Sequence, residues 1–352
     1  MKLGVKILIL LVALLIISAF FLNRGEKRMA PEFQGIEAWI NSSPLTMESL
    51  RGKVVLVDFW TYSCINCLRT LPYLTSWDEK YRDKGLVIIG IHTPEFQFEH
   101  DQSNVRMAVS KYGLKYPVAL DNGYQTWIAF QNHFWPHKYL IDPEGVIRYE
   151  QIGEGRYEET EATIQKLLAE RGAKAEMAMT SVPENGIEPR KIGTPEIYFG
   201  LEKSEQQGNE ERIIADRVIP YKSPREVKEN RFYLVGPWAV SRESARFIGG
   251  AEGRIVLRYT ARNVNIVAGA VGDQAVAVEI ELDGSPLTIK TAGSDVRIGS
   301  QGRATVQIKE HRLYSLVQDQ AGYGTHTLTI KILPSLPRKE TDGLQAFTFT
   351  FG

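Results

Sequence analysis

The stretch that decides the fold is Val-Val-Leu-Val-Asp-Phe-Trp-Thr-Tyr-Ser-Cys-Ile-Asn-Cys, residues 54–67. Its first seven residues are apolar except for Asp58, as in a strand buried on both faces of a parallel sheet. Cys64 and Cys67 follow, and residues 68–82 then carry apolar side chains at helical spacing. A strand, a Cys-x-x-Cys pair and a helix in this order predict an α/β domain with a redox-active pair at the helix start.

The residues that follow extend this α/β pattern. Further strands are predicted at residues 86–91, 117–120, 138–141 and 146–151, and further helices at residues 104–112, 124–130 and 158–171. The turn Asp142-Pro143-Glu144-Gly145 makes the last two strands an antiparallel pair. Helices alternating with strands, then a hairpin and a final helix, predict a mixed sheet with parallel strands at its centre. We assign residues 31–171 to this domain.

The pattern changes after residue 171. Residues 172–192 contain Pro183, Gly186, Pro189 and many charges, which predicts a linker. In residues 193–352 apolar and polar residues alternate, with Gly, Asp and Asn turns between short segments. The predicted strands are residues 254–260, 274–282, 306–309, 326–332 and 345–351. Short strands spaced in this way predict an all-β sandwich of the jelly-roll type.

Residues 1–30 predict a membrane anchor and a charged tether. Residues 7–22 are apolar apart from Ser18, and Lys2 and Lys6 precede them. A helix that starts at Leu3 would measure about 30 Å, the thickness of the hydrocarbon core of a bilayer. We expect a single uncleaved helix in the cell membrane, with the soluble domains on the extracytoplasmic side. A cleaved signal peptide is the alternative.

Composition excludes several classes of function. Lys+Arg and Asp+Glu are both 42, so no basic excess predicts a nucleic-acid partner. The two cysteines cannot form a framework of structural disulfides. A structural zinc site needs four ligands, and no second Cys/His pair has suitable spacing. Leu68 after the second cysteine rules out the Cys-x-x-Cys-His haem attachment motif. We therefore expect no cofactor and no metal.

Cys64 and Cys67 are the first candidate catalytic residues. The start of a helix presents unpaired N–H groups and partial positive charge, which favour a thiolate. Cys64 is expected to be the exposed nucleophile that attacks a partner disulfide. Cys67, one turn further along the helix, is expected to resolve the mixed disulfide. The expected partners are therefore protein thiols and disulfides.

Two further residues are candidates for the same site. Asp58 interrupts an apolar strand, and burial would raise its pKa so that it accepts the proton of Cys67. The alternative is a strand-end aspartate that faces solvent or binds backbone. Pro136 follows Trp135 just before a predicted strand, where a cis proline would leave the neighbouring backbone free to pair with an extended substrate.

With these motifs in place, the chain resembles the thioredoxin superfamily. Asp58, Phe59 and Trp60 match the Asp-Phe-Trp strand end of that family, and Pro136 matches its cis-proline. Residues 33–40 and the run Leu50-Arg51-Gly52-Lys53 are similar to the TlpA/ResA branch of membrane-tethered extracytoplasmic thioredoxins. Residues 61–67 and 92–96 and the β-rich tail resemble the C-terminal part of DipZ-type cytochrome c biogenesis proteins. These join a thioredoxin-like domain to a galactose-binding-like, carbohydrate-binding-like sandwich.

The resemblance implies a membrane-anchored extracytoplasmic thiol–disulfide oxidoreductase. It implies a separate membrane reductant or oxidant as partner, and a role in cytochrome c maturation or envelope redox homeostasis. It also places Trp60, Tyr62, Glu95 and Trp135 at the border of the active site. For Glu95, a solvated loop position is the alternative.

Two other functions remain open. Phe232, Tyr233, Trp238 and Phe247 are candidates for an aromatic platform under an envelope glycan, which would make the sandwich the main binding domain. Aromatic side chains at such spacing are more often part of a core, and we favour that interpretation. A thiol peroxidase is a weaker alternative. Thr61 lies three residues before Cys64 as that activity needs, but Val57 stands where its signature has a proline.

Overall fold

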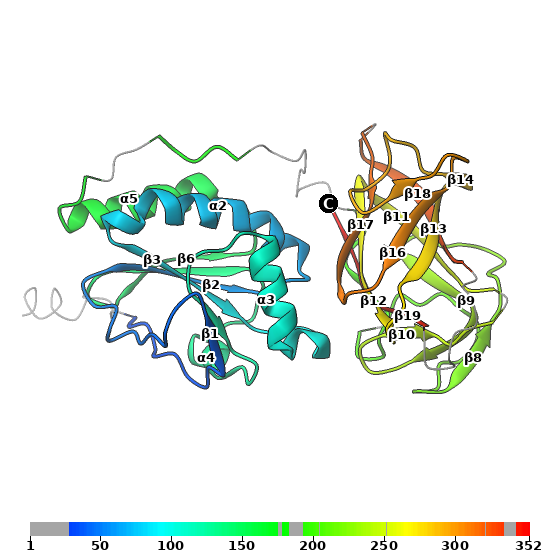
Figure 1. Cartoon of the computed structure of the whole chain (residues 1–352), viewed down its shortest axis with the longest axis horizontal. Coiled ribbons are helices and arrows are strands. Elements are labelled where there is room, and N and C mark those ends of the chain that lie inside the picture. The colour runs from blue at the N-terminus through cyan, green and yellow to red at the C-terminus, as the bar shows by residue number, and fades with distance from the viewer. Residues whose placement is uncertain are drawn as a thin grey trace, which may run out of the picture. The chain divides into compact units, whose positions relative to one another are not determined.

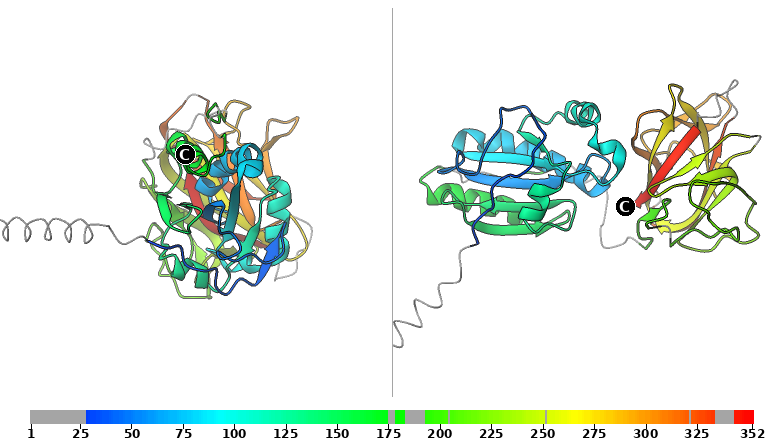
Figure 2. Two further views of the ribbon diagram at one scale, coloured as in Figure 1. Left: turned by 90° about the vertical axis from the view of Figure 1, so that its left-hand side faces the viewer. Right: turned by 90° about the horizontal axis from the view of Figure 1, so that it is seen from below.

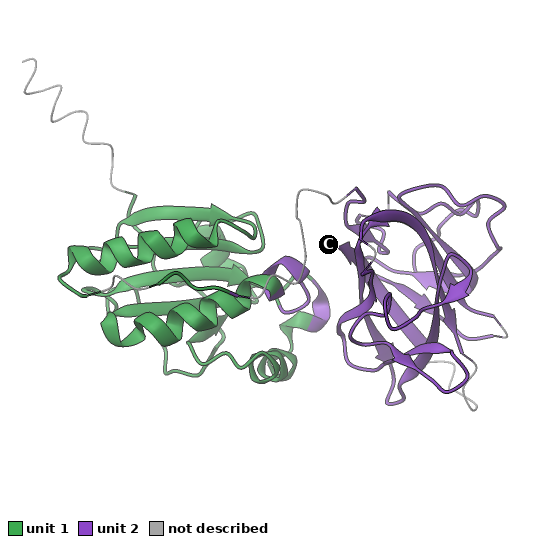
Figure 3. Cartoon of the chain, turned by 90° about the horizontal axis from the view of Figure 1, so that it is seen from above, with its two compact units in different colours: residues 1–61, 69–95, 99–181 green, residues 62–68, 96–98, 182–352 purple. Residues whose placement is uncertain are grey.

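The computed structural model describes residues 28–174, 178–182, 193–203, 205–250, 252–320, 322–333 and 343–352. The chain divides into two compact units, residues 1–61, 69–95 and 99–181 and residues 62–68, 96–98 and 182–352 (Figure 3). Nearly all of the predicted anchor and most of the predicted linker lie outside the described residues. Within the described ranges, no helix is both long and apolar enough to cross a membrane.

A six-stranded mixed sheet forms the centre of the α/β domain. Its strands, in spatial order, are β1 (Ala38–Ile40), β4 (Val118–Leu120), β3 (Leu86–His92), β2 (Val54–Trp60), β5 (His137–Ile141) and β6 (Ile147–Ile152). β2, β3 and β4 run parallel, β1 is antiparallel to β4, and β5 is antiparallel to both of its neighbours. The predicted arrangement of central parallel strands with a flanking hairpin is confirmed.

Four α-helices surround this sheet, namely α2 (Ile65–Tyr81), α3 (Gln102–Lys111), α4 (Gln125–Ala129) and α5 (Tyr157–Glu170), with short 3₁₀ helices η1 (Arg82–Lys84) and η2 (Gln97–His100). α2 and α5 lie side by side on one face (Figure 1), where Tyr73 stacks on Tyr157 with ring centroids 3.6 Å apart. α2 begins at Ile65, three residues earlier than predicted, because the Cys-x-x-Cys segment itself forms its first turn.

Strand β2 sends alternate side chains to the two faces of the sheet. Val55, Val57 and Phe59 belong to a core cluster with Trp127 and Phe130 at α4. Because neighbouring side chains in a strand point to opposite faces, Asp58 points away from that cluster. It therefore lies on the face that α2 and α5 cover (Figure 1).

The chain stays bound to the α/β domain beyond α5. The buried carboxylate of Glu161 accepts a hydrogen bond from the Thr180 amide at 2.6 Å and from the Thr180 hydroxyl at 2.9 Å. Lys80 Nζ donates to the Ala178 carbonyl at 2.7 Å. Residues 178–180, within the predicted linker, are therefore fixed to α2 and α5.

The second part of the chain is a single antiparallel sheet. Its strands are β7 (Ile197–Tyr198), β8 (Val218–Tyr221), β9 (Arg231–Val240), β10 (Ala245–Phe247), β11 (Arg254–Ala261), β12 (Asn263–Val271), β13 (Val276–Leu282), β14 (Ser285–Pro286), β15 (Arg297–Ile298), β16 (Ala304–Ile308), β17 (Arg312–Gln318), β18 (Gly324–Ile332) and β19 (Gly343–Phe351). Figure 2 shows these strands curving round, and their buried side chains form one core cluster. The prediction of a β-rich C-terminal domain is confirmed.

Strand β9 joins two halves of this sheet, one formed by β11, β18, β13 and β16 and the other by β10, β19, β12 and β17. Its first half pairs with β11, and its second half pairs with β8 and β10. Side chains from both halves, such as Leu257 of β11 and Phe349 of β19, share one core. β12 was not predicted because eight of its nine residues are buried, which removes the alternation that marks a half-exposed strand.

Candidate active site

The two cysteines lie at the N-terminus of α2. Cys64 is partly exposed and immediately precedes the helix, whereas Cys67 is 1% exposed and sits in its first turn. The amide of Cys67 donates to Cys64 Sγ at 3.4 Å, and the amide of Leu68 donates to the Cys64 carbonyl at 3.0 Å. The exposed sulfur of Cys64 thus accepts a hydrogen bond from a main-chain amide in the first turn of α2.

Asp58 is buried in β2, on the face of the sheet that α2 covers. Its exposure is 1%, and neither carboxylate oxygen has a hydrogen-bond partner among the described residues. Burial raises the pKa of Asp58 to about 7, and the charge of Lys138 partly offsets this rise. The aspartate therefore neither faces solvent nor binds backbone, which excludes the alternative interpretation. Its pKa of about 7 places its titration near neutral pH.

Lys138 is a functional candidate that the sequence did not reveal. The register of β2 and β5 pairs Asp58 directly with Lys138, and side chains paired in this way point to the same face. Lys138 is 0% exposed and donates to the Gly153 carbonyl at 3.1 Å. The one available signal was a lysine as the first residue of the predicted strand at residues 138–141, which is also what a strand end at the surface shows.

Pro136 lies at the start of β5, next to this pair. The Trp135–Pro136 peptide bond is cis. The amide of Gly153 donates to the Pro136 carbonyl at 2.8 Å, so Gly153 bonds to both Pro136 and Lys138. The partly exposed Trp135 packs on Trp127 with ring centroids 4.3 Å apart, and its Nε1 donates to the Thr93 carbonyl at 3.0 Å.

The other predicted border residues differ in exposure. Trp60 is fully buried and packs edge-to-face on His92, with ring centroids 5.4 Å apart. Tyr62 is 4% exposed, and its hydroxyl donates to the Phe98 carbonyl at 3.5 Å. Glu95 is partly buried in the loop after β3. Only Trp135 and Glu95 of this group therefore present appreciable surface.

A second buried carboxylate, Glu99, was also missed by sequence reasoning. It lies in η2, is 0% exposed, and accepts a hydrogen bond from the Thr61 hydroxyl at 2.5 Å. Its other oxygen accepts the Glu95 amide at 2.6 Å. Nothing in the periodicity of this loop distinguishes Glu99 from a solvated glutamate.

Comparison with known protein families assigns both parts of the chain. Residues 27–150 match the AhpC/TSA family, and residues 194–352 match the thioredoxin like C-terminal domain. The protein DipZ of Mycobacterium bovis is 36% identical over 329 residues, which are 92% of this chain and 43% of DipZ. The chain thus spans less than half the length of that relative.

Two shorter relatives match the α/β domain alone. The thiol-disulfide oxidoreductase YkuV of Bacillus subtilis is 29% identical over 40% of this chain and 94% of its own length. The thiol-disulfide oxidoreductase ResA of Bacillus thuringiensis is 29% identical over 42% of this chain and 83% of its own length. The chain therefore combines an AhpC/TSA-type domain with a thioredoxin like C-terminal domain and is a homologue of DipZ, and its first domain is similar to the thiol-disulfide oxidoreductases YkuV and ResA.

Proposed function

We propose that this protein exchanges disulfides with protein substrates through Cys64 and Cys67. The observation that carries the proposal is the amide of Cys67 directed at Cys64 Sγ at 3.4 Å, at the start of a helix. The Cys64 thiolate attacks a substrate disulfide, forms a mixed disulfide and releases one substrate thiolate. The Cys67 thiolate then attacks Cys64 Sγ and releases the second. Two electrons pass to the substrate and a Cys64–Cys67 disulfide remains; the reverse sequence oxidises a dithiol.

Asp58 and Pro136 support this exchange in the proposal. Cys67 must lose its proton before it attacks, and a carboxylate with a pKa of about 7 can accept that proton at neutral pH. Pro136 supports the substrate side of the site. Trp60, Tyr62, Glu95 and Trp135 shape its border, and the two more exposed side chains, Glu95 and Trp135, contact substrate.

The cellular setting is part of the same proposal. The apolar run at residues 7–22 supports a single N-terminal anchor with the two domains outside the cytoplasm. A membrane reductant or oxidant would then recycle Cys64 and Cys67 in cytochrome c maturation or envelope redox homeostasis. Extraction of the full chain from membranes only by detergent, together with protease access to the α/β domain in intact spheroplasts, is the expected result. Release by salt washing alone would refute the anchor.

Cysteine variants test the chemistry. Cys64→Ser should reduce disulfide exchange with insulin to the uncatalysed rate, because the attacking sulfur is lost. Cys67→Ser should accumulate mixed disulfides, seen by mass spectrometry of acid-quenched samples, because Cys64 still attacks but nothing resolves the product. Turnover at the wild-type rate in either variant would refute the proposal. Thiol-dependent consumption of hydrogen peroxide without insulin reduction would instead support the peroxidase.

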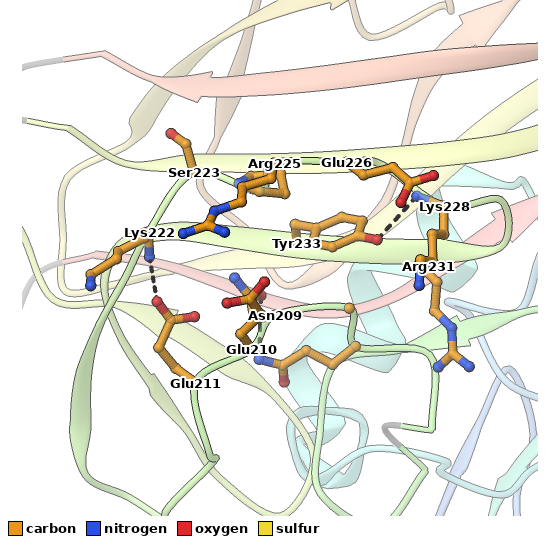
Figure 4. Close-up of a pocket in the computed structure, with 13 residues that line it drawn as sticks. Asn209, Glu210, Glu211, Lys222, Ser223, Arg225, Glu226, Lys228, Arg231 and Tyr233 are labelled. Atoms are coloured by element: carbon orange, nitrogen blue, oxygen red, sulfur yellow. Dashed lines mark hydrogen bonds between the residues drawn. The ribbon is translucent and has the colours of Figure 1, made fainter.

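Glycan binding by the β-rich domain is the second candidate. Phe232, Trp238 and Phe247 belong to the buried core, as we favoured, and are not available to a ligand. Tyr233 alone of the four lines a cavity of about 680 Å³ with charged and amide side chains, among them Asn209, Lys222, Arg225 and Arg231 (Figure 4). Peptidoglycan and glycan-array binding by the full chain, compared with Tyr233→Ala, tests this candidate. Equal binding by both proteins would exclude the cavity.

A further inference from the structure

The buried carboxylate of Glu99 requires a physical explanation. Removing a carboxylate from water is costly unless donors satisfy its oxygens. Glu99 is 0% exposed, and two donors to its carboxylate come from different segments. Thr61 Oγ1 donates to Oε1 at 2.5 Å, and the Glu95 amide donates to Oε2 at 2.6 Å. Two short hydrogen bonds to one side chain thus join the two segments.

Both segments belong to the proposed active site. Thr61 follows the last residue of β2 and precedes Cys64 by three residues. Glu95 is the acidic residue of the loop after β3. The Thr61 hydroxyl also lies 3.4 Å from His92 Nε2 at the end of β3. Burial lowers the pKa of His92 to about 3, so this ring is neutral at pH 7 and adds no charge to the group.

The same loop is tied to the segment that carries Pro136. Thr93 donates its amide to the Trp60 carbonyl at 3.1 Å and accepts Trp135 Nε1 on its own carbonyl at 3.0 Å. Residues 93–95 therefore connect the end of β2 on one side with the Trp135–Pro136 segment on the other. Glu99 holds the far end of these residues, at the Glu95 amide.

We propose that Glu99 is a positioning residue for disulfide exchange, because its two oxygens fix the segment leading into Cys64 to the loop that carries Glu95. The inference rests on the proposed function of Cys64 and Cys67. Exchange requires the attacking sulfur, the target disulfide and the leaving sulfur to be aligned, and small displacements of such groups cost large factors in rate. Glu99 touches none of the reacting atoms and acts only through Thr61 and Glu95.

Glu99→Gln is the first variant, because it keeps the size of the side chain. Its amide oxygen can accept only one of the two hydrogen bonds, and its NH₂ group then faces the other donor. We expect kcat/KM for insulin reduction to fall about tenfold or more. Glu161→Gln is the matched control, since Glu161 is equally buried and also accepts an amide at 2.6 Å, but at α5. It should keep wild-type kcat/KM.

Thr61 supplies the test that distinguishes positioning from general damage. Thr61→Ser retains the hydroxyl donor and should retain most of the activity, whereas Thr61→Val has the same shape without the donor and should lose it. The loss of kcat/KM in the double variant Thr61→Val/Glu99→Gln should be much smaller than the product of the two separate losses. Both substitutions disrupt the same hydrogen bond between Thr61 and Glu99. The comparison of Thr61→Ser with Thr61→Val decides the question even where Glu99→Gln fails to fold.

The outcomes separate the two proposals. Wild-type kcat/KM in folded Glu99→Gln, or equal losses in Thr61→Ser and Thr61→Val, would overturn the positioning role while inactive Cys64→Ser left the proposed function intact. A loss in Glu161→Gln as large as that in Glu99→Gln would also overturn it. Full activity in Cys64→Ser would overturn the proposed function itself.

Discussion

Replacing Lys138 by methionine should move the pH dependence of the resolving step upward. The side chain of methionine is apolar and of similar length, so the change removes the charge with little loss of volume. Lys138 lowers the pKa of Asp58, which burial alone would raise beyond its value of about 7. Without the lysine, the carboxylate should hold its proton to higher pH and accept the proton of Cys67 less readily at pH 7.

The size of the effect follows from the sheet register. Directly paired side chains have Cβ atoms about 5 Å apart, and two unit charges at about that distance attract by about 3 kcal/mol at an effective dielectric constant of about 20. One pKa unit corresponds to about 1.4 kcal/mol, so the midpoint should rise by about two units. The ionised fraction of Asp58 at pH 7, and with it the rate, should fall by up to about fiftyfold.

The resolving step can be measured by itself. A mixed disulfide between Cys64 and thionitrobenzoate releases a coloured thiolate when Cys67 attacks, and stopped-flow absorbance gives that rate between pH 5 and 10. Wild type should be half-maximal near pH 7, and Lys138→Met should approach the wild-type maximum at high pH. Lys138→Arg keeps the charge and should keep the midpoint near that of wild type.

Combination with Asp58→Asn provides the decisive comparison. If Lys138 acts through Asp58, adding Lys138→Met to Asp58→Asn should leave the remaining pH profile unchanged. An unchanged or lowered midpoint in Lys138→Met alone would refute the reasoning. A further upward shift in the double variant would show that Lys138 acts on another group.

Two predictions concern stability, measured by urea unfolding across pH. The folded-state pKa of Asp58 lies above its unfolded value, so wild type should lose stability as pH rises from about 4 to about 7. Over that range the free energy of unfolding of Asp58→Asn should rise by about 2–4 kcal/mol relative to wild type. Parallel stability curves for the two proteins would contradict this. Burial lowers the pKa of His137 from 6.5 to about 4, so the unfolded chain takes up the proton at higher pH than the folded protein. Wild type should therefore lose stability as pH falls from about 6.5 to about 4, and His137→Gln should lose less over that range. An equally steep loss in His137→Gln would show that other groups cause it.

Most of the correct predictions about the α/β domain came from the spacing of residues that are close together in the sequence. The buried run at residues 54–60, the cysteine pair after it and the turn at residues 142–145 each depend on a few adjacent residues. Their geometry follows from strand alternation, helix electrostatics and turn chemistry, which act over one or two turns of chain. The same logic identified Asp58, because a lone carboxylate in an apolar strand stands out without any knowledge of its neighbours.

Prediction was weaker for the second domain. Five strands, β11, β13, β16, β18 and β19, were predicted, but the long strands β9, β12 and β17 and the short strands β7, β8, β10, β14 and β15 were not. Which of four aromatic side chains faces a cavity also depended on how distant strands pack. Tyr233 lines the cavity formed around residues 207–211 and 222–231, whereas Phe232 and Trp238 belong to the core of the domain.

The sequence alone placed Cys64 and Cys67 at the start of a helix, since the two cysteines and that helix start are neighbours along the chain. Only the tertiary structure decided what surrounds that pair. Lys138 faces Asp58 because of the register of β2 and β5, and a slip of one residue would place it on the opposite face of the sheet. Glu99 lies 38 residues after Thr61 in the sequence, yet it accepts hydrogen bonds from both Thr61 and Glu95. Burial and pairing between distant segments determine which ionisable side chains lie near one another, and no local sequence pattern predicts these contacts.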